Sequence, residues 1–241
     1  MASRRGRASF GLVLLVALAL VAARPRHVAR VAQGRIEGTV QLAPGLSAKK
    51  PRIRLYGDYG PGSQPPRPPP SGEVANVVIY LDSVPWNGQA APSAKPLRIE
   101  QRDETFVPHV LPVLRGSTVE FPNGDPLFHN VFSLSATKTF DLGRYPKGTS
   151  KSVRFERSGI VQVFCHIHSD MSAVVLVLDN PLFAVPVDGR YVIQDLPPGE
   201  YRVVAWHERI KPIAQHVRVS GDGVTVVDWV IPLPPPEEPR P

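Results

Sequence analysis

The chain has 241 residues and a formal net charge of +7, from 28 Lys and Arg against 21 Asp and Glu. This length suits two small domains or one large one. The positive charge is spread out without a dense run of Lys or Arg, which argues against nucleic-acid binding and at most favours an acidic redox partner.

The first residues predict an export signal. Arginines at positions 4, 5 and 7 precede an apolar run over 10–23 that ends in small residues. The run suits a signal-peptide core and is short for a transmembrane helix, so we expect a signal peptide over 1–23 and a periplasmic or secreted, bacterial-type protein. An uncleaved segment would instead anchor the protein to a membrane, and twin-arginine export is an open alternative to the general route.

The rest of the chain predicts an all-β protein. Runs of strand length that are rich in Val and Ile recur between turn signals, and long helical periodicity is missing. The predicted strands cover 35–42, 76–82, 97–101, 109–114, 117–121, 151–156, 159–164, 173–178, 190–193, 201–206, 216–219 and 224–231. The proline-rich stretch 60–72 predicts a surface loop, and 234–241 predicts a proline-rich tail.

The strands divide the chain into a central unit and two flanking pieces. Residues 95–180 form the central unit, between a front piece (34–90) with two convincing strands and a back piece (181–233) with four. Two strands alone cannot bury a core. We therefore expect 34–90 and 181–233 to form one discontinuous β-sandwich, with the central unit inserted between them.

Four side chains of the central unit suit a mononuclear copper site. They are His129 upstream, and Cys165, His168 and Met171 close together downstream. Two imidazoles, a thiolate and a weak thioether are the donors of a type 1 (blue) copper electron-transfer centre. Cys165 is the only cysteine in the chain, so no disulfide competes for it. Asn130 is expected behind the ligands, where its side chain could tie the two ligand loops together.

Other interpretations of these residues fit less well. A structural zinc site wants a fourth N, S or O donor, and methionine is a poor one. A c-type haem needs a second cysteine. A catalytic Cys–His pair needs an orienting group and an oxyanion hole, and no helix start is visible near Cys165. We therefore expect that the protein is not an enzyme.

The stretch 106–178 resembles the cupredoxin family. The resemblance rests on the segment 119–123 (VEFPN) followed by His129-Asn130-Val131, and on the loop Cys165-x-x-His168-x-x-Met171, whose short spacing is similar to that of amicyanins, within the amicyanin and plastocyanin-like group. It covers about a third of the chain. It implies a Greek-key β-sandwich with copper at one end.

A second resemblance covers the flanks. The segments 188–193 (DGRYVI) and 196–203 (LPPGEYRV), with 38–40 (GTV) and 77–81 (VVIYL), resemble the transthyretin-like fold of carboxypeptidase regulatory domains, which overlaps carbohydrate-binding-like sandwiches. The combined layout is similar to bacterial proteins named for methylamine utilisation. Trp86, Trp206 and Trp229 could form a sugar platform there, although core packing is the favoured interpretation, and His207 is expected at the surface.

Together these features predict an exported type 1 copper protein that carries single electrons between cupric and cuprous states. His168 would be the exposed edge for electron exit, and redox protein partners would bind weakly and transiently. One alternative is a copper-binding or delivery protein without electron transfer. Another is an envelope or carbohydrate-binding module with an accessory copper domain.

Overall fold

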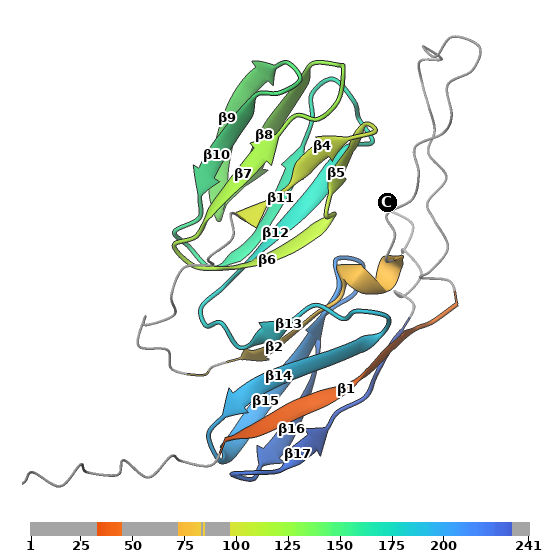
Figure 1. Cartoon of the computed structure of the whole chain (residues 1–241), viewed down its shortest axis with the longest axis vertical. Coiled ribbons are helices and arrows are strands. Elements are labelled where there is room, and N and C mark those ends of the chain that lie inside the picture. Colours follow the sequence, from red (N-terminus) through yellow and green to blue (C-terminus); the bar gives the residue numbers. More distant parts are fainter. Residues whose placement is uncertain (1–32, 45–71, 83, 85–96, 233–241) are drawn as a thin grey trace, which may run out of the picture. The chain divides into compact units, whose positions relative to one another are not determined.

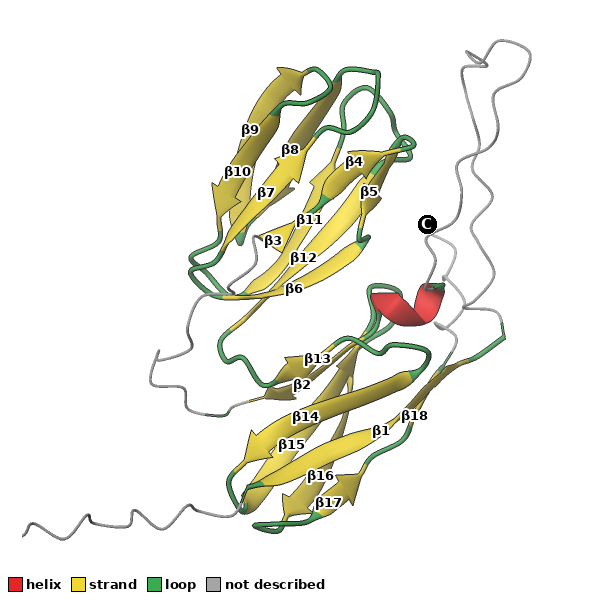
Figure 2. Ribbon diagram, viewed as in Figure 1, coloured by secondary structure: helices red, strands yellow, loops and turns green. Residues whose placement is uncertain are grey.

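The computed structural model describes residues 33–44, 72–82, 84 and 97–232, all of which belong to the compact unit Val31–Pro241. The predicted signal, most of 60–72, Trp86 and the tail lie outside the described residues. Figure 2 shows strands throughout, with a single short 3-10 helix, η1 (Glu73–Asn76), in the described part. The all-β prediction is thus confirmed. A search of the described residues finds no helix with the length and apolar character that crossing a membrane requires.

Residues 97–178 form a sandwich of two sheets with an added hairpin (Figure 1). One sheet has the order β10-β7-β3 and contains β3 (Leu97–Arg98), β7 (Thr118–Pro122) and β10 (Ser150–Arg154). The other has the order β6-β12-β11-β8-β9 and contains β6 (Val110–Leu114), β8 (His129–Ser135), β9 (Lys138–Tyr145), β11 (Gly159–Phe164) and β12 (Ser172–Leu178). The antiparallel hairpin pairs β4 (Glu100–Arg102) with β5 (Thr105–Val107).

Alternation along the strands builds the core of this sandwich. In β11 the side chains of Val161 and Val163 are fully buried while Ile160 faces solvent, as the two-residue period of a strand requires. Val119 and Phe121 of β7 pack into the same core from the opposite sheet. Burying each such side chain contributes about 1.5–3 kcal/mol to stability. This shared core therefore holds the two sheets together.

The strands β8 and β9 were not among the strands predicted from the sequence, although β8 begins with His129. Their pairing is antiparallel and aligns His129 with Tyr145. β8 contains one Val and no Ile, β9 contains neither, and half of the β9 residues are exposed. A search for Val/Ile-rich runs therefore passes over them, because their stability comes from cross-strand pairing rather than from a continuous apolar sequence.

The flanking pieces share two further sheets. One contains β1 (Gly34–Leu42), β14 (Arg190–Leu196), β17 (Val224–Val226) and β18 (Trp229–Ile231), with β1 antiparallel to β14 and parallel to β17 and β18. The other has the order β13-β2-β15-β16 and contains β2 (Val78–Asp82), β13 (Phe183–Ala184), β15 (Gly199–Trp206) and β16 (Ile213–Val219). Strands from before and after the central unit thus pair in both sheets.

The core of the flanking sandwich contains two consecutive hydrogen bonds between buried groups. The Trp229 indole N–H donates to the Tyr191 hydroxyl over 3.0 Å, and that hydroxyl donates to the Val227 carbonyl over 2.6 Å. Gly38 lies so close to this carbonyl that a Cβ would collide with it. The strand β1 therefore needs glycine at this point to approach residue 227.

Two tryptophans and one histidine of the flanking pieces are buried. Trp206 and Trp229 are buried, with 4% and 2% of their surface exposed, which supports core packing over an exposed sugar platform. The expectation of a surface His207 is wrong, because this residue is fully buried. Its Nε2 lies 3.2 Å from a Glu73 carboxylate oxygen, and its Nδ1 accepts the Arg209 backbone N–H over 3.2 Å.

Candidate metal centre

The Asn123 side chain holds the loop that leads to His129, the first residue of β8, through three hydrogen bonds. The buried Asn123 side chain donates to the carbonyls of Leu127 and Tyr145 over 2.9 and 3.0 Å. Its oxygen accepts the Asp125 backbone N–H over 2.9 Å. One amide side chain therefore supplies partners for three backbone groups around the segment between β7 and β8.

Cys165 directly follows β11, and the loop to β12 is closed by its own backbone hydrogen bonds. The Cys165 N–H donates to the Met171 carbonyl over 3.3 Å, and the Met171 N–H donates to the His168 carbonyl over 3.1 Å. Met171 is 1% exposed and belongs to the core of the sandwich. The closed loop keeps three of the four predicted ligands within seven consecutive residues at one end of the fold.

The imidazole and thiol donors converge. His129 Nδ1 lies 3.1 Å from His168 Nδ1, and Cys165 Sγ lies 4.0 Å from each of these nitrogens. Atoms at these separations share an equidistant point about 2.2 Å from each, which matches metal–imidazole and metal–thiolate bonds of roughly 2.0–2.3 Å. Among the described residues, these three form the one group of His, Cys, Asp or Glu found close enough to share a metal ion. The axial role of Met171 stays a prediction.

Cys165 is prepared to act as a thiolate ligand. Burial by itself would raise the pKa of the thiol, but the His129 imidazole and the backbone N–H groups of residues 130, 168 and 167 outweigh it and lower the pKa to about 6. The sulfur is therefore ionised at neutral pH, and the thiolate is the form that binds metal.

The second nitrogen of His129 is held by a carboxylate that the sequence analysis did not identify. His129 Nε2 lies 2.7 Å from Asp125 Oδ2, and both side chains are buried. Burial lowers the pKa of His129, but the hydrogen bonds to Asp125 and Cys165 raise it to about 9. Burial would likewise raise the pKa of Asp125, which is lowered instead by His129 and by the backbone N–H groups of Glu104 and Asp103. An acid four residues before a ligand histidine was the only sequence signal for this contact.

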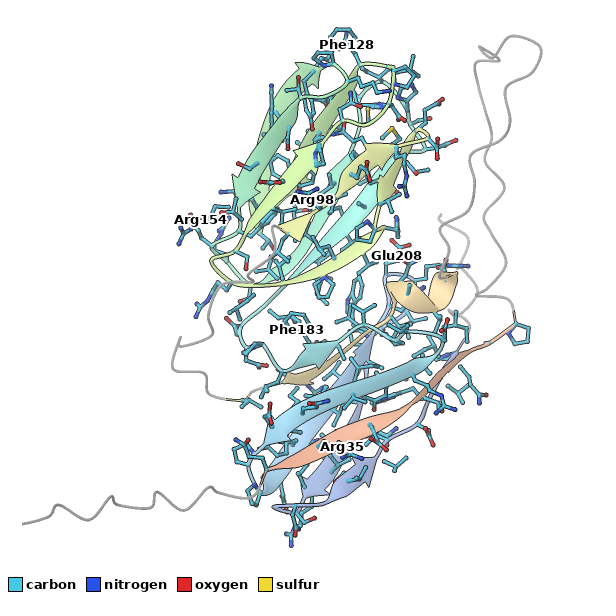
Figure 3. The ribbon with its side chains drawn as sticks, in the orientation of Figure 1. Arg35, Arg98, Phe128, Arg154, Phe183 and Glu208 are labelled. Atoms are coloured by element: carbon cyan, nitrogen blue, oxygen red, sulfur yellow. The ribbon has the colours of Figure 1, made fainter. Side chains whose placement is uncertain are left out.

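The His168 side chain is less exposed to solvent than the sequence predicted. Its side chain is 22% exposed, and its Nε2 lies 3.9 Å from a carboxylate oxygen of Glu104. The exposed apolar side chains at this end are Leu127 and Phe128 beside His129, and Ile167 beside His168. Figure 3 shows Phe128 at one end of the central sandwich. The surface at the candidate site is therefore shared between His168 and these apolar neighbours.

Asn130 and His166 flank the ligands in different ways. The buried Asn130 side chain donates to Asp141 on β9 over 2.6 Å rather than reaching the Cys165 loop. Its backbone N–H, not its side chain, bonds to the Cys165 sulfur and joins the two ligand segments. His166 points outward, as a neighbour of a strand-end ligand should, and stacks on the Phe132 ring at 3.7 Å between centroids.

No protein-family model matches the chain, and no curated protein matches it. Among solved structures, the Cu-containing nitrite reductase of Thermus scotoductus SA-01 is 23% identical, with a TM-score of 0.35, over 39% of this chain and 24% of that chain. The oxidised P94A mutant of amicyanin is 21% identical, with a TM-score of 0.33, over 34% of this chain and 82% of that chain. A purple cupredoxin from Nitrosopumilus maritimus is 22% identical, with a TM-score of 0.32, over 34% of this chain and 99% of that chain. The chain thus spans about a quarter of the nitrite reductase.

Proposed function

We propose that this protein is an exported type 1 copper protein that carries single electrons. The observation that carries the proposal is the convergence of two imidazole Nδ1 atoms and one thiolate sulfur around a point within bonding distance of all three. Soft thiolate and thioether donors favour cuprous ion, while imidazole serves both oxidation states. When bound, copper would supply the one-electron couple.

The protein's own part in this function is to keep the donors still. His129 is fixed between the cluster and Asp125, and the Cys165 sulfur accepts backbone N–H groups from both ligand loops. Neither side chain needs to move when the charge at the site changes, so little reorganisation accompanies electron transfer.

An electron carrier fits this site better than an enzyme does. Catalytic metal sites keep a coordination position open for water or substrate. Here His129, Cys165 and Met171 are all buried, with at most 5% of their surface exposed. Electrons would pass at the partly exposed His168 and its apolar neighbours, to redox proteins that bind weakly through a small contact.

Repeated redox cycling separates this proposal from copper delivery. The full-length protein, loaded with one equivalent of cupric ion, is reduced by ascorbate and reoxidised by ferricyanide in the presence of a cuprous chelator. A carrier retains its copper and recovers its absorption after each cycle. Transfer of the copper to the chelator during the first reduction would favour delivery instead.

A further inference from the structure

The two-residue turn between β4 and β5 lies over the metal centre and has an unusual backbone. Asp103 and Glu104, its central residues, both have φ of 52°. Such hairpin turns need positive φ at both central positions and normally use Asn, Asp or Gly at the first and Gly at the second. Glutamate is uncommon in this conformation and persists where surrounding contacts hold it.

Asp125 supplies those contacts. One of its carboxylate oxygens accepts the Asp103 N–H over 2.6 Å, and the other accepts the Glu104 N–H over 2.9 Å. The second oxygen also accepts the His129 Nε2–H over 2.7 Å. A single buried carboxylate therefore connects the turn to one of the two histidines of the cluster.

The same turn reaches the other histidine. The Glu104 carboxylate lies 3.9 Å from His168 Nε2, and both side chains are about three-quarters buried. Each imidazole of the cluster thus directs Nδ1 towards the shared metal position and Nε2 towards a carboxylate. A carboxylate hydrogen-bonded to the remote nitrogen of a ligand histidine, as Asp125 is at His129, fixes the tautomer and strengthens the donor. Glu104, at 3.9 Å, acts on His168 through its charge.

We infer that the Asp103–Glu104 turn is a positioning element for the copper site, with Glu104 acting through His168 and Asp125 acting through His129. This inference rests on the proposed function. The two negative charges stabilise cupric ion more than cuprous ion, because cupric ion carries the larger charge. They therefore hold the reduction potential below the value that the four ligands alone would set.

The test is the reduction potential of the copper-loaded full-length protein, measured by following its visible absorption. Glu104→Gln keeps the size of the side chain and removes its charge. We expect the charge-transfer band to remain and the ratio of cupric to cuprous affinity to fall about tenfold, the lower end for a removed outer partner. That change raises the potential by about 59 mV.

Asp103→Asn is the matched control, because it removes one charge from the adjacent, exposed position of the same turn. Its shift should be much smaller, since no contact joins that side chain to either histidine in the described structure. In the cuprous protein, the Nε2-bound proton of His168 should also exchange faster with water in Glu104→Gln than in Asp103→Asn.

Equal shifts in the two variants, with a normal band in both, would overturn the positioning role while leaving the copper site intact. A wild-type protein that binds no copper would overturn the proposed function, and this inference with it. If Glu104→Gln loses the band together with its fold, Glu104→Asp takes its place, because its shorter side chain draws the carboxylate away from His168. Its potential should rise above the wild-type value by more than that of Asp103→Asn, and an unchanged potential would overturn the positioning role.

Discussion

Under the proposed function, copper binding would displace a proton from His129. With the pKa of His129 at about 9 and that of Cys165 at about 6, the metal-free site at neutral pH holds a protonated imidazole beside a thiolate. Apparent copper affinity should therefore rise with pH by about tenfold per unit from this proton alone, and level off above about pH 9. Below about pH 6, protonation of Cys165 should weaken binding more steeply. Competition titrations across this range measure the slope, and an affinity that does not change with pH would contradict these protonation states.

Asp125→Asn tests the cause of the raised His129 pKa. Without the carboxylate, His129 should lose its proton at lower pH, so the levelling of copper affinity should move to lower pH. At high pH, where the proton no longer competes, cupric affinity should still fall about 10–100-fold because the outer partner of the ligand is lost. An Asp125→Asn profile that superimposes on the wild-type profile would show that the contact has no influence on the ligand.

Met171→Leu separates an axial ligand from a core residue. The side chain is 1% exposed, and exchange of Met for Leu in a core costs less than about 1.5 kcal/mol. The variant should keep its copper and its colour while its reduction potential rises, because a weak donor to cupric ion is lost. Spectroelectrochemistry measures the shift. Complete loss of copper from a folded variant would instead make Met171 a primary ligand.

At the scale of elements, the loop before β8 depends on Asn123. Asn123→Ala leaves the buried Tyr145 carbonyl, the buried Asp125 N–H and the part-buried Leu127 carbonyl without this partner. An unsatisfied buried group costs about 1–3 kcal/mol, so chemical denaturation should show a clear loss of stability. Copper affinity should fall as well, because this loop carries both Asp125 and His129. Normal affinity in a destabilised variant would mean that the strand pairing of β8 alone positions His129.

Sequence patterns predict those elements whose apolar residues occur in runs or alternate. The strand β11 was predicted with the bounds it has, and β7 and β12 were each predicted to within one residue. The hairpin turn at Asp103–Glu104 could not be predicted, because Glu is uncommon at the second central position and Asp125, distant in sequence, holds the turn. Long-range hydrogen bonds of this kind override local propensity and leave no local signal.

The sequence predicted the ligand residues of the candidate site but not the carboxylates that contact them. Cys165, His168 and Met171 share a short loop, so their spacing alone predicted their proximity, and the unique cysteine excluded a disulfide. The remote nitrogens of the histidines were not predictable, since Asp125 and Glu104 meet them only through the fold. The openness of His168 was overestimated for the same reason.

At the scale of the whole molecule, strand pairing separates the central unit from its flanks. The apolar cluster at the centre of the central sandwich draws all its members from residues 97–177, whereas β14 and β15 of the back piece pair with β1 and β2 of the front piece. The segment 95–180 expressed alone should therefore fold and bind copper, while 181–233 alone should be unfolded or aggregated. Amide chemical-shift dispersion and copper binding measure both, and a disordered 95–180 segment would contradict the insertion arrangement.

The most direct test of the copper assignment is a cupric titration of the reduced, metal-free full-length protein, followed by visible absorption. We expect an intense thiolate-to-copper charge-transfer band that saturates at one equivalent in the wild type. Cys165→Ser should lack the band, because a hydroxyl does not replace a soft thiolate donor. A wild-type protein with its single cysteine reduced that stays colourless throughout the titration would contradict the account.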